Sequence, residues 1–187
     1  SRACGVIERP LASEQPLGHD QIVALVHEVA TELVPRGSQH VIVVVGGSLL
    51  AWHHLRETTV DVDSIRRIDD ELASAFAKVA ARHDLAPRWM NDRAAAFVPQ
   101  TFDEALCEVL LDRPRLRVLG LPLRDAFLMK LFAGRDRDQA DLVVLWSHCG
   151  FAYAREAVDA MYEAYPAAPD DPHLESFVEQ IIQEATS

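Results

Sequence analysis

The chain has 187 residues, of which 49% are hydrophobic and 25% charged, and its formal net charge is −11. This length suits one ordinary domain, or a domain with an appended helical bundle. The negative charge argues against a protein that coats nucleic acid unspecifically, because such binding depends on neutralising phosphates.

No stretch of the sequence has the roughly 20 consecutive apolar residues that a membrane helix needs, and no secretory signal is visible. We therefore expect a cytoplasmic protein with no membrane partner. The cysteines Cys4, Cys107 and Cys149 are odd in number and widely spaced. This pattern favours neither a disulfide framework nor a zinc site, and reduced thiols are expected.

The first third of the chain predicts a helix, a strand, a short helix and a second strand. Residues 20–33 have apolar side chains at helical spacing, and the β-branched run 40–47 predicts a buried strand that ends in two glycines. Ser48 is placed to cap a short helix that reaches about Leu55. The alternation of residues 58–63 predicts a strand that carries Thr59, Asp61 and Asp63 on one face.

The middle of the chain predicts one long helix and several weaker elements. Asp63 or Ser64 could cap a helix that continues to about His83. Two weak strand candidates cover residues 87–92 and 94–99. A capping box, Thr101 with Glu104, predicts a helix that carries Leu106 and Leu110, and residues 115–121 predict another short strand.

From Pro122 onward only helices are predicted, at 122–133, 137–148, 151–165 and 172–185. The expected fold class is therefore α/β (α+β), with a mixed sheet flanked by helices and followed by a C-terminal helical bundle. We divide the chain into an α/β domain, residues 1–121, and a helical domain, residues 122–187.

Asp61 and Asp63 are the first candidates for a functional site. At positions i and i+2 of a strand, their carboxylates lie side by side and could hold hard divalent cations. A surface strand with solvated acids explains the same pair equally well when it is considered alone.

Gly46, Gly47 and Ser48 come just before these acids and change the balance between the two explanations. Glycines at a strand end allow a ligand to approach the backbone, and a serine at a helix start offers donors to an anion. The usual phosphate loops are not matched, because neither GxGxxG nor Gly-Lys-Ser/Thr occurs here. An anion cradle beside paired carboxylates suits a nucleoside triphosphate with its metal ions.

These motifs resemble those of a known superfamily. A Gly-Gly-Ser turn, a helix and Asp-x-Asp on the next strand resemble the signature of DNA polymerase β-like nucleotidyltransferases. The later segment LRVLGLPLRDAFLMKLFAGRDRDQADL resembles the Lys…Arg-x-Arg-Asp-x-x-Asp-Leu motif of AbiEii-type nucleotidyltransferases, which include the MenT toxins. The resemblance covers residues 41–145, and both motifs occur in the family's order.

The resemblance implies roles for individual residues. Asp61 and Asp63 would bind Mg²⁺ (or Mn²⁺), and the turn with Gly47 and Ser48 would hold the triphosphate. Lys130 would neutralise the β and γ phosphates, with Asp141 as its partner or as part of the acidic site. A turn at residues 134–138 would bring that aspartate back to the lysine, because one continuous helix would hold them about 16 Å apart.

Three further positions complete the candidate site. Arg56 and Arg137 are secondary candidates for phosphate contact, although plain surface arginines are an equal alternative. Thr59 corresponds to a position that an antitoxin phosphorylates in this family, where added negative charge would repel both triphosphate and metal ligands. Many members of the superfamily take a third metal carboxylate from a later strand, and here only Asp92 is available as a stand-in.

The resemblance also implies a substrate and a partner. The expected reaction transfers a nucleotide from a nucleoside triphosphate, CTP or UTP, to the 3′ end of tRNA, which makes the protein a growth-inhibiting toxin with a cognate antitoxin. The arginine-rich stretch 113–137 is the expected contact for the acceptor end. Two alternatives remain open, namely a small-molecule or protein acceptor and a catalytically inactive binding module.

Overall fold

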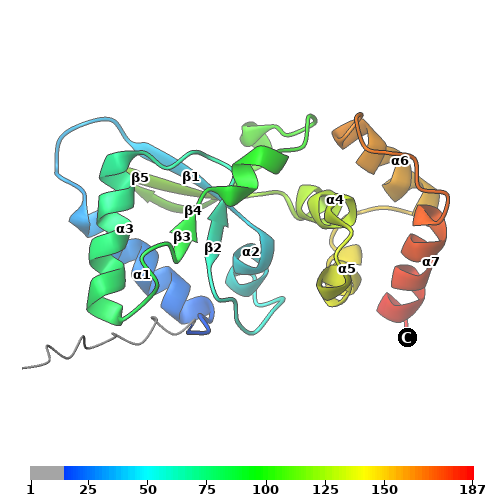
Figure 1. The fold of residues 1–187 in the computed structure, drawn as a ribbon, viewed down its shortest axis with the longest axis horizontal. Coiled ribbons are helices and arrows are strands. Elements are labelled where there is room, and N and C mark those ends of the chain that lie inside the picture. The colour runs from blue at the N-terminus through cyan, green and yellow to red at the C-terminus, as the bar shows by residue number, and fades with distance from the viewer. Residues whose placement is uncertain (1–14) are drawn as a thin grey trace, which may run out of the picture.

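A five-stranded sheet forms the first part of the protein in the computed structural model, which describes residues 15–187 (Figure 1). The strand order is β3-β2-β1-β5-β4. β1 pairs in parallel with β5, and β2 pairs in parallel with β3. The pairs β1–β2 and β4–β5 are antiparallel, so the sheet is mixed. The strands are β1 (His40–Val45), β2 (Val62–Ser64), β3 (Met90–Asn91), β4 (Glu108–Arg113) and β5 (Leu116–Gly120).

Three helices belong to this sheet part, which we define as residues 15–121: α1 (His19–Glu32), α2 (Gly46–Trp52) and α3 (Asp70–His83). α1 and α3 lie side by side (Figure 1), and Arg82 on α3 forms ion pairs with Glu28 and Glu32 on α1. The central strand β1 has no exposed side chain from Ile42 to Val45. This explains its unbroken β-branched run, because a strand buried on both faces needs no polar alternation.

The helical part, residues 122–187, contains four helices: α4 (Leu123–Ala133), α5 (Gln139–Trp146), α6 (Ala154–Ala164) and α7 (Leu174–Ala185). α4 ends at Gly134, which has a φ of +57°. This left-handed conformation is the usual way to end a helix at glycine. A short 3₁₀ turn at Asp136–Asp138 then leads into α5. A mixed sheet with flanking helices and a following helical part confirms the predicted fold class.

The structure corrects the predicted strand around the two aspartates. β2 contains only Val62–Ser64, so Asp61 lies just before the strand. Thr59 pairs instead with Leu17 through an isolated bridge. The following helix α3 begins at Asp70, and Asp69 caps it by accepting a hydrogen bond from the backbone N–H of Leu72. The predicted caps at positions 63 and 64 were therefore wrong, because those residues belong to the sheet.

Residues 87–113 differ most from expectation. β3 lies within the first weak strand candidate, whereas the second is a 3₁₀ helix, Arg93–Phe97. The predicted helix after Thr101 is wrong: only a 3₁₀ turn, Glu104–Leu106, is present. β4 follows that turn and forms a hairpin with β5. The hairpin adds an edge strand to the sheet, and this tertiary pairing overrides the local helical spacing.

The two parts of the protein contact each other at more than their covalent link. The Tyr165 hydroxyl donates to the carbonyl oxygen of Phe97 at 2.8 Å. The backbone N–H of Gln100 donates to the carbonyl oxygen of Ala164 at 2.8 Å. The domain division at residues 121 and 122 falls between β5 and α4 and stays a prediction. Among the helices of residues 15–187, none has the length and apolarity to span a bilayer.

Candidate functional site

The turn from β1 into α2 places two glycines against polar side chains. Gly46 has a φ of +63°, and a Cβ atom there would lie 3.7 Å from Oδ2 of Asp63. A Cβ atom at Gly47 would lie 3.1 Å from both Nη1 of Arg56 and Oγ1 of Thr59. Glycine at both positions therefore keeps the start of α2 in close contact with one predicted metal ligand and one predicted phosphate ligand.

Ser48 lies inside α2, not at its cap. The helix begins at Gly46 and ends at Trp52, so the predicted cap at Ser48 and the predicted end near Leu55 were wrong. The Ser48 side chain is buried, and its Oγ donates to the carbonyl oxygen of Val45 at 2.8 Å. A phosphate contact would require this hydroxyl to turn away from its present acceptor, and the nucleotide-binding role of Ser48 stays a prediction.

Asp61 and Asp63 lie beside the start of α2. In the β1–β2 pair, Asp63 is opposite Val45, the residue that precedes Gly46. Burial raises the pKa of the Asp63 carboxyl, and the negative charge of Asp61 raises that pKa further. Two carboxylates that repel each other in a half-buried position favour a cation nearby.

This pair of carboxylates fits a divalent cation such as Mg²⁺ or Mn²⁺, which takes oxygen ligands. Within residues 15–187, no group of three or more His, Cys, Asp or Glu side chains is arranged to hold a metal ion. The candidate cation site therefore consists of two carboxylates.

Strand β3 and the 3₁₀ helix that follows it each contribute one residue that the sequence did not single out. Asn91 lies opposite Asp63 in the parallel β2–β3 pair. Arg93 forms an ion pair with Asp61, with 2.6 Å between Nη2 and Oδ2. Asp92, the sequence-based stand-in for a third metal ligand, accepts a hydrogen bond from the backbone N–H of residue 68 instead. The position next to Asp63 thus carries an amide and not a carboxylate.

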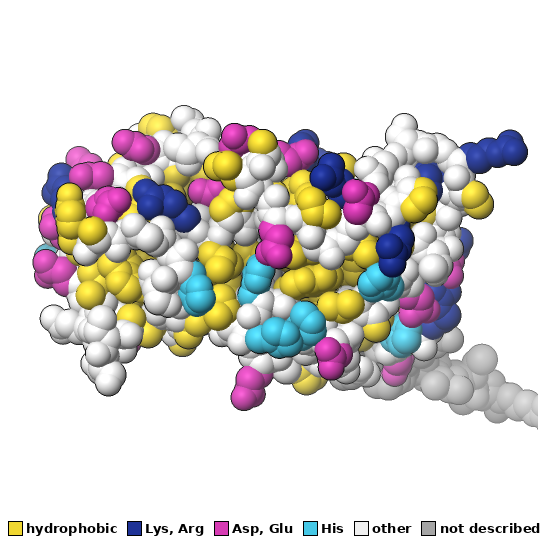
Figure 2. All heavy atoms as spheres, turned by 180° about the vertical axis from the view of Figure 1, so that it is seen from behind, with side chains coloured by type: hydrophobic (Ala, Val, Ile, Leu, Met, Phe, Trp, Pro, Cys, Tyr) yellow, Lys and Arg dark blue, Asp and Glu magenta, His cyan; other side chains and the backbone are white. Residues whose placement is uncertain are grey.

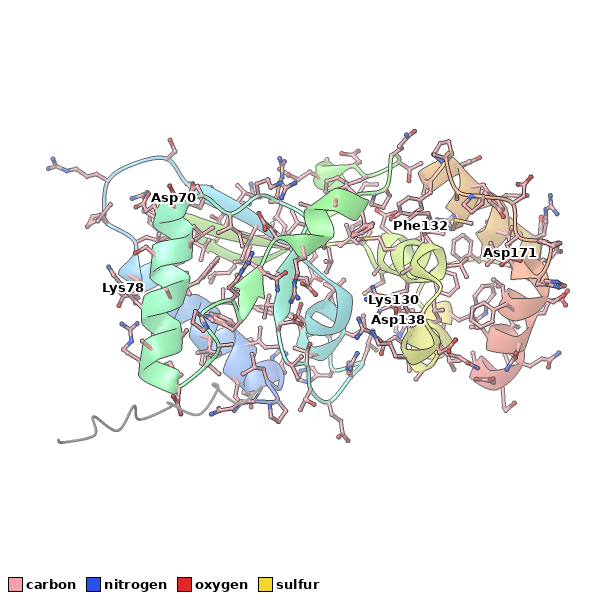
Figure 3. All side chains as sticks on the ribbon, viewed as in Figure 1. Asp70, Lys78, Lys130, Phe132, Asp138 and Asp171 are labelled. Carbon is pink, nitrogen blue, oxygen red and sulfur yellow. The ribbon has the colours of Figure 1, made fainter. Side chains whose placement is uncertain are left out.

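A buried ion network in the helical part contains Lys130 and Asp141. The Lys130 side chain is 9% exposed, and its Nζ lies 2.7 Å from Oδ2 of Asp141. The predicted turn at residues 134–138 thus brings the two together. The same Nζ lies 2.8 Å from Oδ1 of Asp138, which the sequence did not identify. Figure 3 shows Lys130 and Asp138 side by side at α4 and α5.

Two arginines join this network to the sheet part. Nη1 of Arg56, in the loop after α2, lies 3.0 Å from Oδ2 of Asp141. Arg135 has its Nε 3.1 Å from Oδ2 of Asp138 and is near enough to Asp63 to lower its pKa. Arg56 also lies against the glycine turn beside Asp63, because a Cβ atom at Gly47 would be 3.1 Å from its Nη1, so the network adjoins the aspartate pair.

Arg137, the other arginine predicted to contact phosphate, differs from Arg135. It lies in the 3₁₀ turn before α5 and is exposed. Among the described residues it makes no ion pair within 4.0 Å, whereas Arg135 and Arg56 each bind a carboxylate. Its role stays a prediction, and Arg135 is the arginine that the fold brings to the site.

Thr59 is buried beside the aspartates. Its Oγ1 donates to the carbonyl oxygen of Asp61 at 3.0 Å, and its backbone forms two hydrogen bonds with Leu17. Only 7% of the residue is exposed. The predicted phosphorylation would therefore require the bridge to Leu17 to open before a kinase could reach the hydroxyl.

The arginine-rich stretch 113–137 does not form one free basic surface. Arg115 is buried and binds Glu71 together with backbone carbonyl groups. Arg124 stacks over the ring of Phe151, with its Cζ 3.9 Å from the ring centroid. Figure 2 shows the face opposite to Figure 1, where Lys and Arg side chains stand apart among Asp and Glu. Several of these arginines therefore stabilise the fold.

Two cavities adjoin the ion network at its ends. One, of about 560 Å³, is lined by Arg56 together with His19 and His54, whose rings are 4.0 Å apart. The other, of about 420 Å³, lies in the helical part and is lined by Arg135, Phe132 and other residues of α4 to α7. Neither cavity is lined by the aspartate pair.

Comparisons with known proteins give one match. A family model described as "Nucleotidyltransferase of unknown function (DUF6036)" matches residues 21–170, which include the aspartate pair and the ion network. The comparisons with curated proteins and with solved structures found no match.

Proposed function

The chain belongs to this family of nucleotidyltransferases, and from that premise we propose that it transfers a nucleoside monophosphate from a nucleoside triphosphate to a hydroxyl group of an acceptor. We propose that the reaction takes place at Asp61 and Asp63. One observation carries the proposal. The fold gathers two mutually repelling carboxylates, the glycine turn at the start of α2 and two arginines that are anchored on Asp141 and Asp138. Such a cluster offers both a cation site and donors for phosphates.

Each residue of the cluster has a proposed task. Asp61 and Asp63 hold Mg²⁺ or Mn²⁺, which when bound stabilises the charge that develops on the reacting phosphate. Arg56 and Arg135 have side chains that are 44% and 54% exposed, so their guanidinium groups can donate to the triphosphate. Positioning of these donors before the reaction lowers the barrier, because little reorganisation remains.

Lys130 acts mainly as a positioning residue in this proposal. Its ammonium group is enclosed by Asp138 and Asp141 and fixes both carboxylates. These carboxylates in turn orient Arg135 and Arg56 towards the β and γ phosphates. The positive charge of Lys130 also offsets part of the negative charge beneath the triphosphate.

For the acceptor we propose the 3′ end of tRNA, with CTP or UTP as the donor. The support is the resemblance of residues 41–145 to AbiEii-type toxins, including Lys130 and Asp141 in order. Blocked tRNA would stop growth, so the proposal includes a cytoplasmic toxin restrained by a cognate antitoxin. Arg113 and Arg137 are exposed and make no ion pair among the described residues, so they are the arginines of the 113–137 stretch best able to contact the acceptor's phosphates.

A small-molecule or protein hydroxyl is the second candidate acceptor. The net charge of −11 favours it, because a phosphate-rich acceptor such as tRNA is repelled by negative charge. The scattered Lys and Arg side chains on the face shown in Figure 2 favour it too.

Labelled nucleotides distinguish these acceptors. Purified protein is incubated with each α-³²P-labelled triphosphate and Mg²⁺, together with total tRNA, a protein lysate or a small-molecule extract. We expect label from CTP or UTP in the tRNA fraction, and none when EDTA is added. Label in another fraction would support the second acceptor class. No label in any fraction, from protein shown to be folded, would contradict the enzymatic proposal and leave an inactive binding module.

A further inference from the structure

The guanidinium group of Arg93 contacts the aspartate pair and is held there by hydrogen bonds. Its Nη2 donates to Oδ2 of Asp61 at 2.6 Å. Its Nε and its backbone N–H both donate to Oδ1 of Asn91, at 2.9 and 3.1 Å. Asn91 therefore holds the guanidinium group in place while that group holds Asp61.

Asn91 occupies the strand position from which a third carboxylate could have completed the site. It lies opposite Asp63 and is 3% exposed, and its Nδ2 has no hydrogen-bond partner within residues 15–187. An amide brings no negative charge, and its oxygen already accepts from Arg93. An aspartate of similar size here would have given three carboxylates, enough to share between two metal ions.

We propose that the site binds a single divalent cation and that the Arg93 guanidinium group takes the place of a second one. Resting on the proposed function, this inference describes how the same site balances its charge. With one divalent cation, the charges of Asp61 and Asp63 are already matched, and Arg93 adds one positive charge for an incoming phosphate. A second metal ion would meet the guanidinium group of Arg93, and among residues 15–187 no third His, Cys, Asp or Glu side chain joins the pair to hold it.

The same geometry makes Arg93 a competitor of the metal ion for Asp61. The guanidinium group must leave or share Oδ2 when a cation binds there. Removing the guanidinium group should therefore raise the affinity of the first cation about tenfold. A nearby opposite charge changes the proton affinity of a carboxylate by about the same factor, that is, by about one pKa unit. Metal binding without nucleotide reports this competition directly.

Electron paramagnetic resonance of free Mn²⁺ gives the number of bound ions per chain and their affinity. We expect one ion per wild-type chain, about tenfold tighter binding in Arg93→Ala, and a second ion only in the double variant Asn91→Asp, Arg93→Ala. The matched control is Arg67→Ala, which removes an arginine that is 77% exposed and pairs with Asp92. Circular dichroism checks that each variant is folded.

Three results would overturn the inference: two Mn²⁺ ions of similar affinity on the wild-type chain, no bound ion, or an Arg93→Ala affinity equal to that of Arg67→Ala. If the double variant does not fold, the single Arg93→Ala variant and the wild-type stoichiometry still decide the question. Because no step uses a nucleotide or an acceptor, a negative transfer assay leaves this test unaffected, and the two proposals fail separately.

Discussion

Replacing Asp63 with asparagine is expected to lower the rate of nucleotidyl transfer about a thousandfold, the size of effect seen when a key electrostatic contact to a transition state is removed. Asparagine keeps the shape of the side chain but lacks the charge that holds a divalent cation. The measurement is the initial rate of label incorporation at saturating nucleotide. Asp61→Asn is expected to have the same effect.

The same Asp63→Asn change is expected to stabilise the folded chain at pH 7. Burial and the charge of Asp61 raise the pKa of Asp63 above the ordinary aspartate value of 3.8, so the folded protein holds this proton more tightly than the unfolded one. Ionisation of Asp63 therefore opposes folding at any pH above the raised pKa, and this penalty disappears as the pH falls below about 3.8. Urea denaturation should show the variant more stable at pH 7, with a smaller difference near pH 4.

Asp159→Asn is the matched control for both effects. Asp159 lies on α6, is 57% exposed and, among residues 15–187, pairs with Arg155 alone, at 2.9 Å. Its loss should leave transfer unchanged and have little effect on stability, because water screens an exposed ion pair. Full transfer activity in purified Asp63→Asn protein would remove the aspartate pair from the proposed chemistry.

Replacing Lys130 with methionine is expected to destabilise the chain by about 3 to 5 kcal/mol. Methionine fills a similar volume but leaves Asp138 and Asp141, whose side chains are 8% and 10% exposed, facing each other without the shared cation. Arg135 and Arg56 pair with these carboxylates from the outside and offset only part of their charge. Thermal and urea denaturation measure the loss.

A second variant separates stability from function at this position. In Lys130→Met with Asp138→Asn, one of the two facing charges is removed, so much of the lost stability should return. Transfer should still be impaired, with a KM for the nucleotide raised about tenfold or more, because Arg135 has lost its carboxylate partner and the network has lost a cation. If the folded double variant had a wild-type KM, Lys130 would serve stability alone.

The parts of the site that could be predicted from the sequence are those that local patterns encode. Gly46 and Gly47 end a β-branched run, and the spacing of Asp61 and Asp63 keeps them together even though the strand that carries Asp63 begins only at Val62. The glycine-centred turn after α4 likewise predicts that Asp141 returns to Lys130, and these are 2.7 Å apart in the structure. Each of these inferences needs only neighbouring residues and the geometry of one helix or one strand.

Features that depend on pairing between distant segments could not be predicted in this way. Asn91 and Arg93 reach the aspartates because a two-residue strand, β3, pairs with β2, and no periodicity marks a strand that short. β4 was predicted as a helix because Leu106 and Leu110 have helical spacing. Its edge position leaves only Leu111 fully buried, so the alternation typical of a strand is weak.

The arginines show a third limit. Sequence alone selects Arg56 and Arg137 as phosphate contacts and does not distinguish Arg135 from the other arginines of the 113–137 stretch. Only the folded chain shows that the first two bind Asp141 and Asp138, whereas Arg137 makes no ion pair among the described residues. Ser48 shows the same limit, because its hydroxyl is committed to a backbone carbonyl group one helical turn earlier.

The most direct test of one shared metal and triphosphate site is a crystal structure with Mn²⁺ and a CTP analogue whose α–β bridge cannot be cleaved. The account predicts one anomalous Mn²⁺ peak bound by Asp61 and Asp63, with the phosphate chain between Gly47 and the guanidinium groups of Arg56 and Arg135. Nucleotide and metal bound away from Asp61 and Asp63, for example in the cavity between α4 and α7, would contradict it.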